Sequence, residues 1–308
     1  MLKPKKLSNN NFLSSLDISK DEILHIFELA KNFKNKSFDL QLDKKVLGLI
    51  FDKSSTRTRV SFQVAMSRLG GTTIDLNPNT SQIGRGEPIK DTARVLSRYC
   101  DVLAIRTFKQ SDLEDYSKWS SKPVINALTD FEHPCQALAD FLTIKEQLGE
   151  LKGKVLAYIG DSNNVANSLI LCGALLDVEV RIACPKGYEP KTSVIEKSIE
   201  ITKSRDLLKI TNDPNIAALG ADVLYTDVWS SMGEESKKEK KDSQFNGFTI
   251  DSDLVSKANE DSIVLHCLPA YRNKEITDEV IESQKSKVFE QAENRMHVQQ
   301  ALLSCLLS

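Results

Sequence analysis

The chain has 308 residues, of which 40% are hydrophobic and 27% are charged, and its formal net charge is −2 at pH 7. This balance is typical of a globular protein of about two domains. The near-neutral charge argues against a nucleic-acid-binding protein, which normally carries a strongly basic domain. No apolar stretch approaches the ~20 residues of a membrane-spanning helix, and the N-terminal segment resembles neither a signal peptide nor a transit peptide. We therefore expect a cytoplasmic protein that binds neither membranes nor nucleic acids.

In the first half of the chain, short apolar runs alternate with longer amphipathic stretches, the pattern of an α/β fold with a parallel sheet. Ser19-Lys20-Asp21-Glu22 is a capping box and predicts a helix that begins after Ser19. The strands that we predict next are Val46–Phe51, Thr72–Leu76, Val102–Ile105 and Val124–Asn126. The helices that we predict between them are Ser55–Leu69, Pro88–Arg98 and Pro134–Leu148.

A second alternating series begins after Gly149. Its predicted strands are Val155–Ile159, Val178–Ala183, Val223–Thr226 and Ile263–His266, with helices between them. The charge run Ser236–Asp242 is interpreted as a solvated loop, and a last helix is expected over about Gln291–Leu303. We therefore predict an α/β fold of two domains, each a mostly parallel sheet flanked by helices, divided between residues 149 and 150. The periodicity alone does not decide which domain the last helix joins.

Six cysteines lie at positions 100, 135, 172, 184, 267 and 305. They form no C-x-x-C pair, and their spacing fits neither a zinc site nor a small disulfide framework. We interpret them as buried thiols in a reducing compartment, with Cys267 as the exception. No metal site is predicted.

The segment from Ser54 to Arg59 follows an apolar strand and opens an amphipathic helix. A helix N-terminus offers unpaired backbone N–H groups and a partial positive charge, and hydroxyl groups add donors. Arg57 and Arg59 add guanidinium groups, which bind phosphate or carboxylate with two parallel hydrogen bonds. The alternative is an ordinary Ser/Thr cap with surface arginines. Arginines in the first turn oppose the helix dipole, so a bound anion is the better explanation.

The segment His133-Pro134-Cys135-Gln136 follows a predicted strand and begins a helix, with Pro134 at the favoured first position. An imidazole and a carboxamide at this spacing can bind one small amide, because one can polarise a carbonyl while the other binds an amine. The alternative is a histidine that serves only as a helix cap. Next to an anion site, we favour the first interpretation.

Ser55-Thr56-Arg57-Thr58 resembles the carbamoyl phosphate motif of the aspartate and ornithine carbamoyltransferases, and His133-Pro134-Cys135-Gln136 resembles their His-Pro-x-Gln motif. The similarity extends from Phe51 to the C-terminal helix. It implies a carbamoyl phosphate site formed by Ser55, Thr56, Arg57, Thr58, Gln82, Arg106, His133, Gln136, Cys267, Leu268 and Arg295. Among these, the resemblance implies that Arg106, His133 and Cys267 are catalytic and that Gln82 reaches the site of a neighbouring subunit. It also implies that the C-terminal helix, residues 291–308, returns to the first domain (residues 1–149), which would hold carbamoyl phosphate.

Three polar segments follow strands of the second half, at 160–164, 227–233 and 266–270. Open α/β sheets bind ligands at the carboxyl ends of their strands, so these segments are candidates for the second substrate. Gly160-Asp161-Ser162-Asn163-Asn164 could instead be a dinucleotide turn, but it lacks the second and third glycines of G-x-G-x-x-G. A nicotinamide enzyme is therefore disfavoured.

Within the family, Cys267-Leu268-Pro269-Ala270 is similar to the ornithine enzymes, since aspartate enzymes have Pro-Leu-Pro-Arg there. The resemblance implies that L-ornithine is held in domain 150–290 by Asn164, Asp227, Ser231 and Met232, with Ser231–Gly233 as a lid. The implied reaction transfers the carbamoyl group of carbamoyl phosphate to the ornithine side-chain amine, giving citrulline and phosphate. The resemblance implies a homotrimer or a multiple of trimers and neither metal nor organic cofactor. A different amine acceptor, or a non-catalytic anion-binding relative, remains the alternative.

Overall fold

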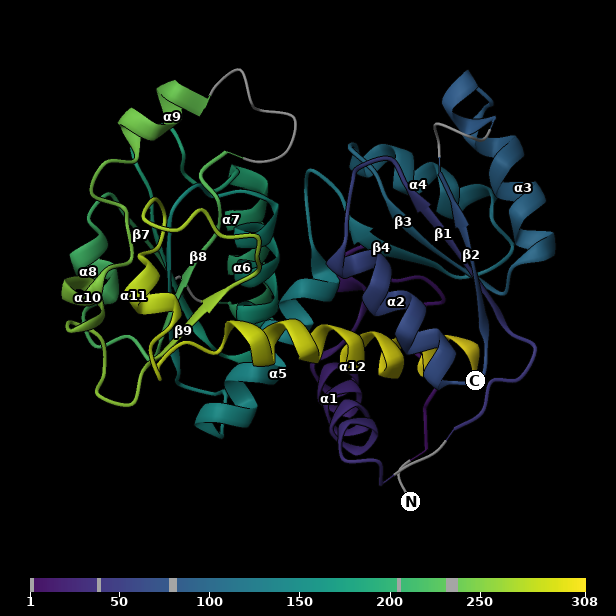
Figure 1. The fold of residues 1–308 in the computed structure, drawn as a ribbon, viewed down its shortest axis with the longest axis horizontal. Helices are drawn as coiled ribbons and strands as arrows, with labels where there is room; N and C mark the ends of the chain where they lie inside the picture. Colours follow the sequence, from purple (N-terminus) through teal and green to yellow (C-terminus); the bar gives the residue numbers. More distant parts are fainter. Residues whose placement is uncertain (1–2, 38–39, 78–81, 204–205, 231–237) are drawn as a thin grey trace. The chain divides into compact units, whose positions relative to one another are not determined.

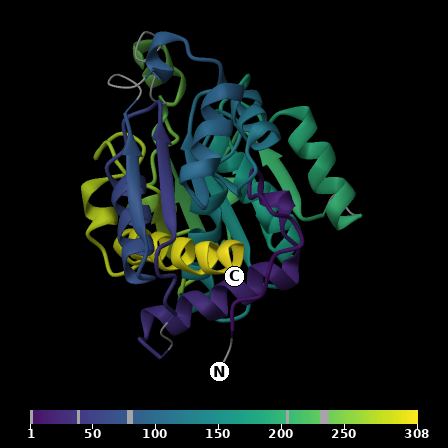
Figure 2. The same ribbon diagram turned by 90° about the vertical axis from the view of Figure 1, so that its right-hand side faces the viewer.

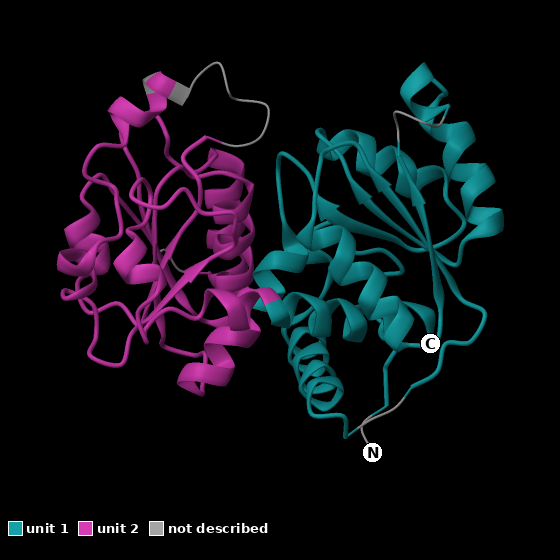
Figure 3. Ribbon diagram, viewed as in Figure 1, with its two compact units in different colours: residues 1–139, 293–308 teal, residues 140–292 magenta. Residues whose placement is uncertain are grey.

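The computed structural model describes residues 3–37, 40–77, 82–203, 206–230 and 238–308. The chain divides into two compact units, one formed by residues 1–139 and 293–308 and the other by residues 140–292 (Figure 3). Both divisions fall inside helices, because α5 (Pro134–Leu148) and α12 (Val288–Leu307) each contribute residues to both units. The first division thus lies within the helix after which the sequence analysis placed the domain boundary.

The first unit contains a parallel sheet with the strand order β2-β1-β3-β4 (Figure 1). Its strands are β1 (Val46–Phe51), β2 (Thr72–Leu76), β3 (Val102–Arg106) and β4 (Val124–Leu128). Its other elements, apart from its parts of α5 and α12, are η1 (Ser15–Asp17), α1 (Lys20–Lys34), α2 (Arg57–Arg68), η3 (Ile83–Arg85), α3 (Ile89–Tyr99) and α4 (Gln110–Trp119).

Helices cover both faces of this sheet, which is why its central strands β1 and β3 are runs of mostly apolar residues. Ile50, Leu103 and Ile105 are buried with Leu113 and Tyr116 on the face covered by α3 and α4. The β1–β2 and β2–β3 connections run in opposite directions, so right-handed crossovers place α2 on the opposite face.

Two contacts tie the ends of the first unit to the rest of it. Phe12 pairs with the edge strand β4, since its N–H donates to the Val124 carbonyl at 2.9 Å and its carbonyl accepts from the Asn126 N–H at 2.7 Å. Helix α12 lies beside α1 in both views (Figures 1 and 2), and Lys34 Nζ donates to Asn294 Oδ1 at 2.9 Å. The first contact covers a sheet edge that would otherwise expose unpaired backbone groups.

The second unit contains a parallel sheet with the order β7-β6-β5-β8-β9. Its strands are β5 (Val155–Ile159), β6 (Glu179–Ala183), β7 (Leu208–Thr211), β8 (Val223–Thr226) and β9 (Ile263–His266). Its helices, apart from its parts of α5 and α12, are α6 (Asn164–Leu176), α7 (Thr192–Thr202), α8 (Pro214–Ala218), α9 (Lys238–Gln244), α10 (Ser252–Val255) and α11 (Asp278–Ile281). An apolar core that includes Ile159, Leu224, Phe245 and Val264 is buried in this unit.

The predicted fold class is confirmed, since two parallel sheets flanked by helices and a C-terminal helix are present. The sequence analysis did not identify β7 or α4. Strand β7 is short, lies at the sheet edge and has the exposed residues Lys209 and Ile210 at its centre, so its apolar signal is weak. The expected solvated loop at Ser236–Asp242 is wrong from Lys238 onward, because α9 begins there. None of the described helices combines the length and the apolar character needed to span a membrane.

Candidate active-site residues

Each sheet has one point at which the direction of strand addition reverses, and the predicted site residues follow the strands at these points. In the first unit the reversal lies between β1 and β3, and the Ser54–Arg59 segment and Arg106 lie at the carboxyl ends of these strands. In the second unit it lies between β5 and β8, which are followed by Asn163 and Asp227. Such reversals leave a crevice at the strand ends where open α/β sheets bind ligands.

Helix α2 begins at Arg57, and its N-terminus has the properties of an anion site. Thr56 occupies the cap position but makes no side-chain cap hydrogen bond. The N–H groups of the first turn are therefore not satisfied by that side chain, as an anion-binding helix start requires. Arg57 is exposed, whereas Thr58 is only 2% exposed.

Arg59, which the sequence analysis grouped with Arg57 as a possible anion ligand, is paired within the protein. Its Nη1 atom lies 2.5 Å from Asp75 Oδ2 on β2, and its guanidinium lies over the Phe51 ring, 5.1 Å from the centroid. An arginine committed to a carboxylate and an aromatic ring is a structural residue. The sequence could not reveal this, because the partner lies on the neighbouring strand.

Arg106 ends β3, and His133 directly precedes α5; both side chains are buried. Burial, with the positive charges of Arg295 and Arg106 nearby, holds the pKa of His133 well below its usual range. The imidazole is therefore neutral at physiological pH. A neutral imidazole can donate one hydrogen bond to a carbonyl oxygen without adding a third positive charge.

Arg295 joins two of the predicted motifs. Its Nη2 atom donates to Thr58 Oγ1 at 2.9 Å, and its Nη1 atom donates to Gln136 Oε1. All three side chains are at most 5% exposed. The structure thus brings together the start of α2, the start of α5 and the C-terminal helix, which the sequence places far apart.

Glu132, which the sequence analysis missed, anchors the loop that carries His133. Its carboxylate is fully buried and accepts hydrogen bonds from Ser15 Oγ at 2.6 Å and the Ser15 N–H at 3.1 Å. Ser14 Oγ also donates to it, at 2.5 Å. The sequence carried one signal of this role: an acidic residue directly before the His-Pro pair.

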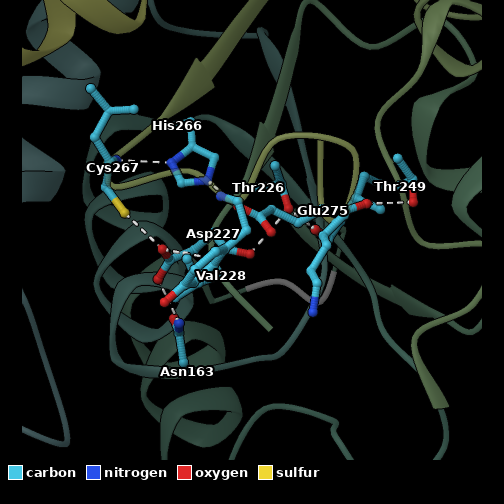
Figure 4. A network of polar contacts seen from close by, with 12 residues as sticks. Asn163, Thr226, Asp227, Val228, Thr249, His266, Cys267 and Glu275 are labelled. Carbon is cyan, nitrogen blue, oxygen red and sulfur yellow. Dashed lines mark hydrogen bonds and ion pairs between the residues drawn. The ribbon is translucent and has the colours of Figure 1, made fainter. Parts of the chain in front are cut away.

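Asp227 is the centre of the polar network in the second unit (Figure 4). Its Oδ1 atom accepts from the Val228 N–H at 2.8 Å and from Cys267 Sγ at 3.0 Å, and its Oδ2 atom accepts from Asn163 Nδ2 at 2.7 Å. Three donors around one carboxylate fit its ionised form, which only accepts hydrogen bonds. An ionised carboxylate at the end of β8 can bind an ammonium group.

Asn163, which the sequence analysis did not single out, contacts Asp227. Its Oδ1 atom accepts from the N–H groups of Val165 at 2.9 Å and Ala166 at 3.3 Å, so it also caps α6. Asn164 is the first helical residue and is half-buried. The two adjacent asparagines therefore have different positions, and the sequence alone could not separate them.

Lys241 on α9 forms a second polar contact in this unit. Its Nζ atom lies 2.6 Å from Asp161 Oδ2, and its side chain is only 5% exposed. Asp161 belongs to the loop that leads into Asn163, and the Tyr158 hydroxyl donates to the Asp161 carbonyl at 2.9 Å. Burial and the nearby carboxylates of Asp227 and Asp161 raise the pKa of Tyr158 well above its usual value, so the hydroxyl remains a donor.

Cys267 and Leu268 follow β9, and Cys267 is the one half-buried thiol among the six cysteines, all of which are described. The other five are buried, and none of the six forms a disulfide. Donor atoms of Asp227, His266 and Cys267 lie within 4.8 Å of one another. Both ring nitrogens of His266 are engaged, however, with the Leu268 N–H and with Glu275, so we assign no metal to this group.

Ser231 and Met232, like the rest of the expected Ser231–Gly233 lid, lie outside the described residues. Gln82 is described; it is exposed and occupies the cap position of η3.

Two parallel α/β units, each with polar groups at its strand reversal, define a class of two-domain α/β proteins with a candidate ligand site in each unit. The chain matches two family profiles: the aspartate/ornithine carbamoyltransferase carbamoyl-P binding domain over residues 10–146, and the Asp/Orn binding domain over residues 152–306. It belongs to the aspartate/ornithine carbamoyltransferase family.

Relatives within this family are similar along the whole chain. An ornithine carbamoyltransferase of Prochlorococcus marinus subsp. pastoris is 76% identical, with 100% of both chains covered. Among solved structures, ornithine carbamoyltransferase from Pyrococcus furiosus is 46% identical with a TM-score of 0.91, covering 99% of this chain and 97% of that one. The enzyme from Gloeobacter violaceus is 45% identical with a TM-score of 0.89, covering 99% and 100%.

Proposed function

We propose that the protein is an ornithine carbamoyltransferase, which transfers the carbamoyl group of carbamoyl phosphate to the side-chain amine of L-ornithine. The observation that carries this proposal is the buried group of Thr58, Gln136 and Arg295 in the same unit as the neutral His133. These residues combine cationic charge for a phosphate with donors and an acceptor for an amide. The family membership of the chain supports the same reaction class.

The first unit would bind carbamoyl phosphate. Ser55, Thr56, Arg57 and Thr58 would hold the phosphate at the start of α2, where hydroxyl and backbone donors converge. Arg295 and Arg106 would neutralise its charge. Gln136 would bind the carbamoyl NH₂ group, with its Oε1 atom oriented by Arg295. The assignment of Cys267 and Leu268 to carbamoyl phosphate rests on the family motif that they belong to.

The second unit would bind ornithine, within the segment 150–290 that the sequence analysis assigned to this substrate. Asp227 would pair with the α-ammonium group, and Asn164, Ser231 and Met232 would hold the α-carboxylate. Asn163 would fix the orientation of Asp227 through the 2.7 Å contact. Cys267, 3.0 Å from Asp227, would orient the amine rather than attack the substrate.

In the proposed reaction the neutral side-chain amine of ornithine attacks the carbamoyl carbon directly. An amine of this kind has a pKa of ~10.4 in water, so the site must favour loss of a proton. Nearby guanidinium groups do so because they disfavour another cation. Attack on the carbonyl produces a tetrahedral intermediate with a negatively charged oxygen.

His133, Arg106 and Thr58 would stabilise this oxyanion. One such donor contributes about 10²- to 10³-fold to a rate. The C–O bond to phosphate then breaks, and the departing phosphate accepts the amine proton. This direct reaction needs no covalent carbamoyl-enzyme intermediate, and none of its steps uses a cofactor.

We further propose a homotrimer, in which Gln82 of one subunit reaches the phosphate of its neighbour, and a cytoplasmic enzyme of arginine metabolism that produces citrulline. The exposed position of Gln82 is consistent with a contact to another subunit. Sedimentation equilibrium of wild-type protein and Gln82→Ala tests the trimer, and steady-state kinetics of both tests the contact of Gln82 with the phosphate. The assembly should remain trimeric while the KM for carbamoyl phosphate rises.

An acceptor panel tests the proposed reaction. Purified protein with carbamoyl phosphate should form citrulline from L-ornithine faster than it carbamoylates aspartate, putrescine or N-acetylornithine. Faster carbamoylation of another amine would identify that amine, and not ornithine, as the substrate. A protein that neither binds carbamoyl phosphate nor carbamoylates any amine would be the non-catalytic relative.

A further inference from the structure

We propose that Glu275, acting through His266, is a positioning residue that holds the turn carrying Cys267 and Leu268. The functional consequence rests on the proposed ornithine carbamoyltransferase activity. The positioning itself rests only on contacts within the second unit (Figure 4). Sequence analysis assigned no role to either residue.

His266 and Glu275 form a buried pair, with exposed fractions of 0% and 1%. His266 Nε2 lies 3.1 Å from Glu275 Oε1, and His266 Nδ1 accepts from the Leu268 N–H at 2.8 Å. A ring nitrogen that accepts carries no proton, so Nε2 must carry the proton and donate to Glu275. The carboxylate thus selects the tautomer that leaves Nδ1 available to Leu268.

Glu275 also holds the far end of the same turn. Its Oε1 atom accepts from the Tyr271 N–H at 2.6 Å. The carboxylate therefore restrains Leu268 through the ring and Tyr271 directly. Since Leu268 has a φ of 55°, in the left-handed region that non-glycine residues rarely adopt, the turn needs such restraint.

The backbone of His266 is held from the strand side as well. The His266 N–H donates to Gln291 Oε1 at 3.0 Å, and Gln291 Nε2 donates to Asp140 Oδ1 at 2.7 Å. With the ring and backbone of His266 both held, the turn begins from a rigid base. Cys267 lies between these restraints, and its Sγ atom reaches Asp227 at 3.0 Å.

Both residues are buried and would act through the turn, so neither needs to touch a substrate. Loss of the restraint should let Cys267 leave Asp227. Because the other five cysteines are buried, modification of the native protein by iodoacetamide, mapped by mass spectrometry, reports selectively on Cys267. This readout does not depend on enzymatic activity.

Two matched pairs of variants separate positioning from general damage. In Glu275→Gln the amide oxygen can replace Oε1 and accept both hydrogen bonds, whereas Glu275→Met keeps the volume and loses them. In His266→Asn the side-chain oxygen can replace Nδ1 as the acceptor for Leu268, whereas His266→Gln cannot. Cys267→Ser provides the labelling background, and thermal unfolding identifies variants that are not folded.

We expect Glu275→Met and His266→Gln to raise the rate of Cys267 modification by about tenfold or more, since each loses at least one hydrogen bond of the turn. Glu275→Gln and His266→Asn should stay within about threefold of wild type. Glu275→Met and His266→Gln should also raise the KM for ornithine about tenfold and leave the KM for carbamoyl phosphate within about twofold of wild type. If Glu275→Met does not fold, the His266 pair carries the test.

Equal modification rates within each folded pair would overturn the positioning role. Failure of the proposed function is distinguishable, because wild-type protein would then form no citrulline while the labelling differences persisted. In active enzyme, the expected differences in Cys267 labelling together with an unchanged KM for ornithine would overturn the functional consequence.

Discussion

Arg295 and Thr58 lie 237 positions apart in the sequence, yet Arg295 Nη2 donates to Thr58 Oγ1 at 2.9 Å. The other terminal nitrogen of the same guanidinium donates to Gln136. One buried cation thus orients a hydroxyl at the start of α2 and a carboxamide at the start of α5. This fork is the geometric link between the two sequence motifs.

Arg295→Lys should show that the fork, and not charge alone, is required. A lysine keeps the charge as a point and lacks the planar pair of donors, so it cannot hold Thr58 and Gln136 together. We expect the KM for carbamoyl phosphate to rise about 10- to 100-fold, which corresponds to one hydrogen bond with a charged group. Steady-state kinetics with saturating ornithine measures this. A KM within twofold of wild type would contradict the role of the fork.

Arg57→Ala should abolish productive binding of carbamoyl phosphate. Arg57 is exposed at the first position of α2, next to a cap residue that makes no side-chain cap hydrogen bond. Arg68→Ala, at the last position of the same helix and also exposed, is the matched control. Calorimetric titration with carbamoyl phosphate should detect binding to the control only. Unchanged affinity and turnover in Arg57→Ala would refute the phosphate role.

The pH dependence of stability should report the buried, neutral His133. Burial and the charges of Arg295 and Arg106 hold its pKa well below the usual value. As pH falls through about 6.5, the unfolded chain binds a proton at this position and the folded chain does not, so the free energy of unfolding decreases. His133→Gln removes that difference.

Denaturant unfolding of both proteins between about pH 7.5 and about pH 5.5 measures the effect. The variant should lose less stability over this interval. The slope of its unfolding free energy against pH should be smaller than that of wild type by an amount equivalent to at most about one bound proton. Parallel curves for the two proteins would show that His133 titrates normally in the folded state.

Cys267→Ser should mainly impair the handling of ornithine. The C–O bond of serine is shorter than the C–S bond of cysteine, so from the same turn the hydroxyl lies farther from Asp227 than the thiol does at 3.0 Å, and the contact is weakened. We expect the KM for ornithine to rise about tenfold, as for loss of one hydrogen bond to a carboxylate. Cys172→Ser, which alters a buried thiol of α6, controls for the loss of a cysteine. A defect confined to carbamoyl phosphate would argue against this assignment.

The sequence alone was sufficient for the elements whose signals are local. β1, β5, β8 and β9 have the predicted bounds, because parallel strands covered on both faces are continuous apolar runs. The Ser19 capping box begins α1 as predicted, since its hydrogen bonds join residues three positions apart. The family motifs were readable for the same reason: each is a short contiguous segment.

Pairings between distant segments were decided only by the tertiary structure. Arg57 and Arg59 are chemically alike in the sequence, but Asp75 on the neighbouring strand binds Arg59. Asn163 and Asn164 are identical neighbours, and the direction of one side chain selects which contacts Asp227. Glu132 is held by hydrogen bonds from Ser14 and Ser15, and Glu275 pairs with His266.

The physical reason is the range of the interactions. Hydrophobic periodicity, capping and turn preferences act over a few residues and leave a pattern in the chain. A buried hydrogen bond needs two groups brought within about 3 Å by the packing of whole sheets and helices, and no local pattern encodes its partner. For this protein, the sequence determined most of the strands and helices and the residue types of the reaction, and the fold determined which of those residues contact one another.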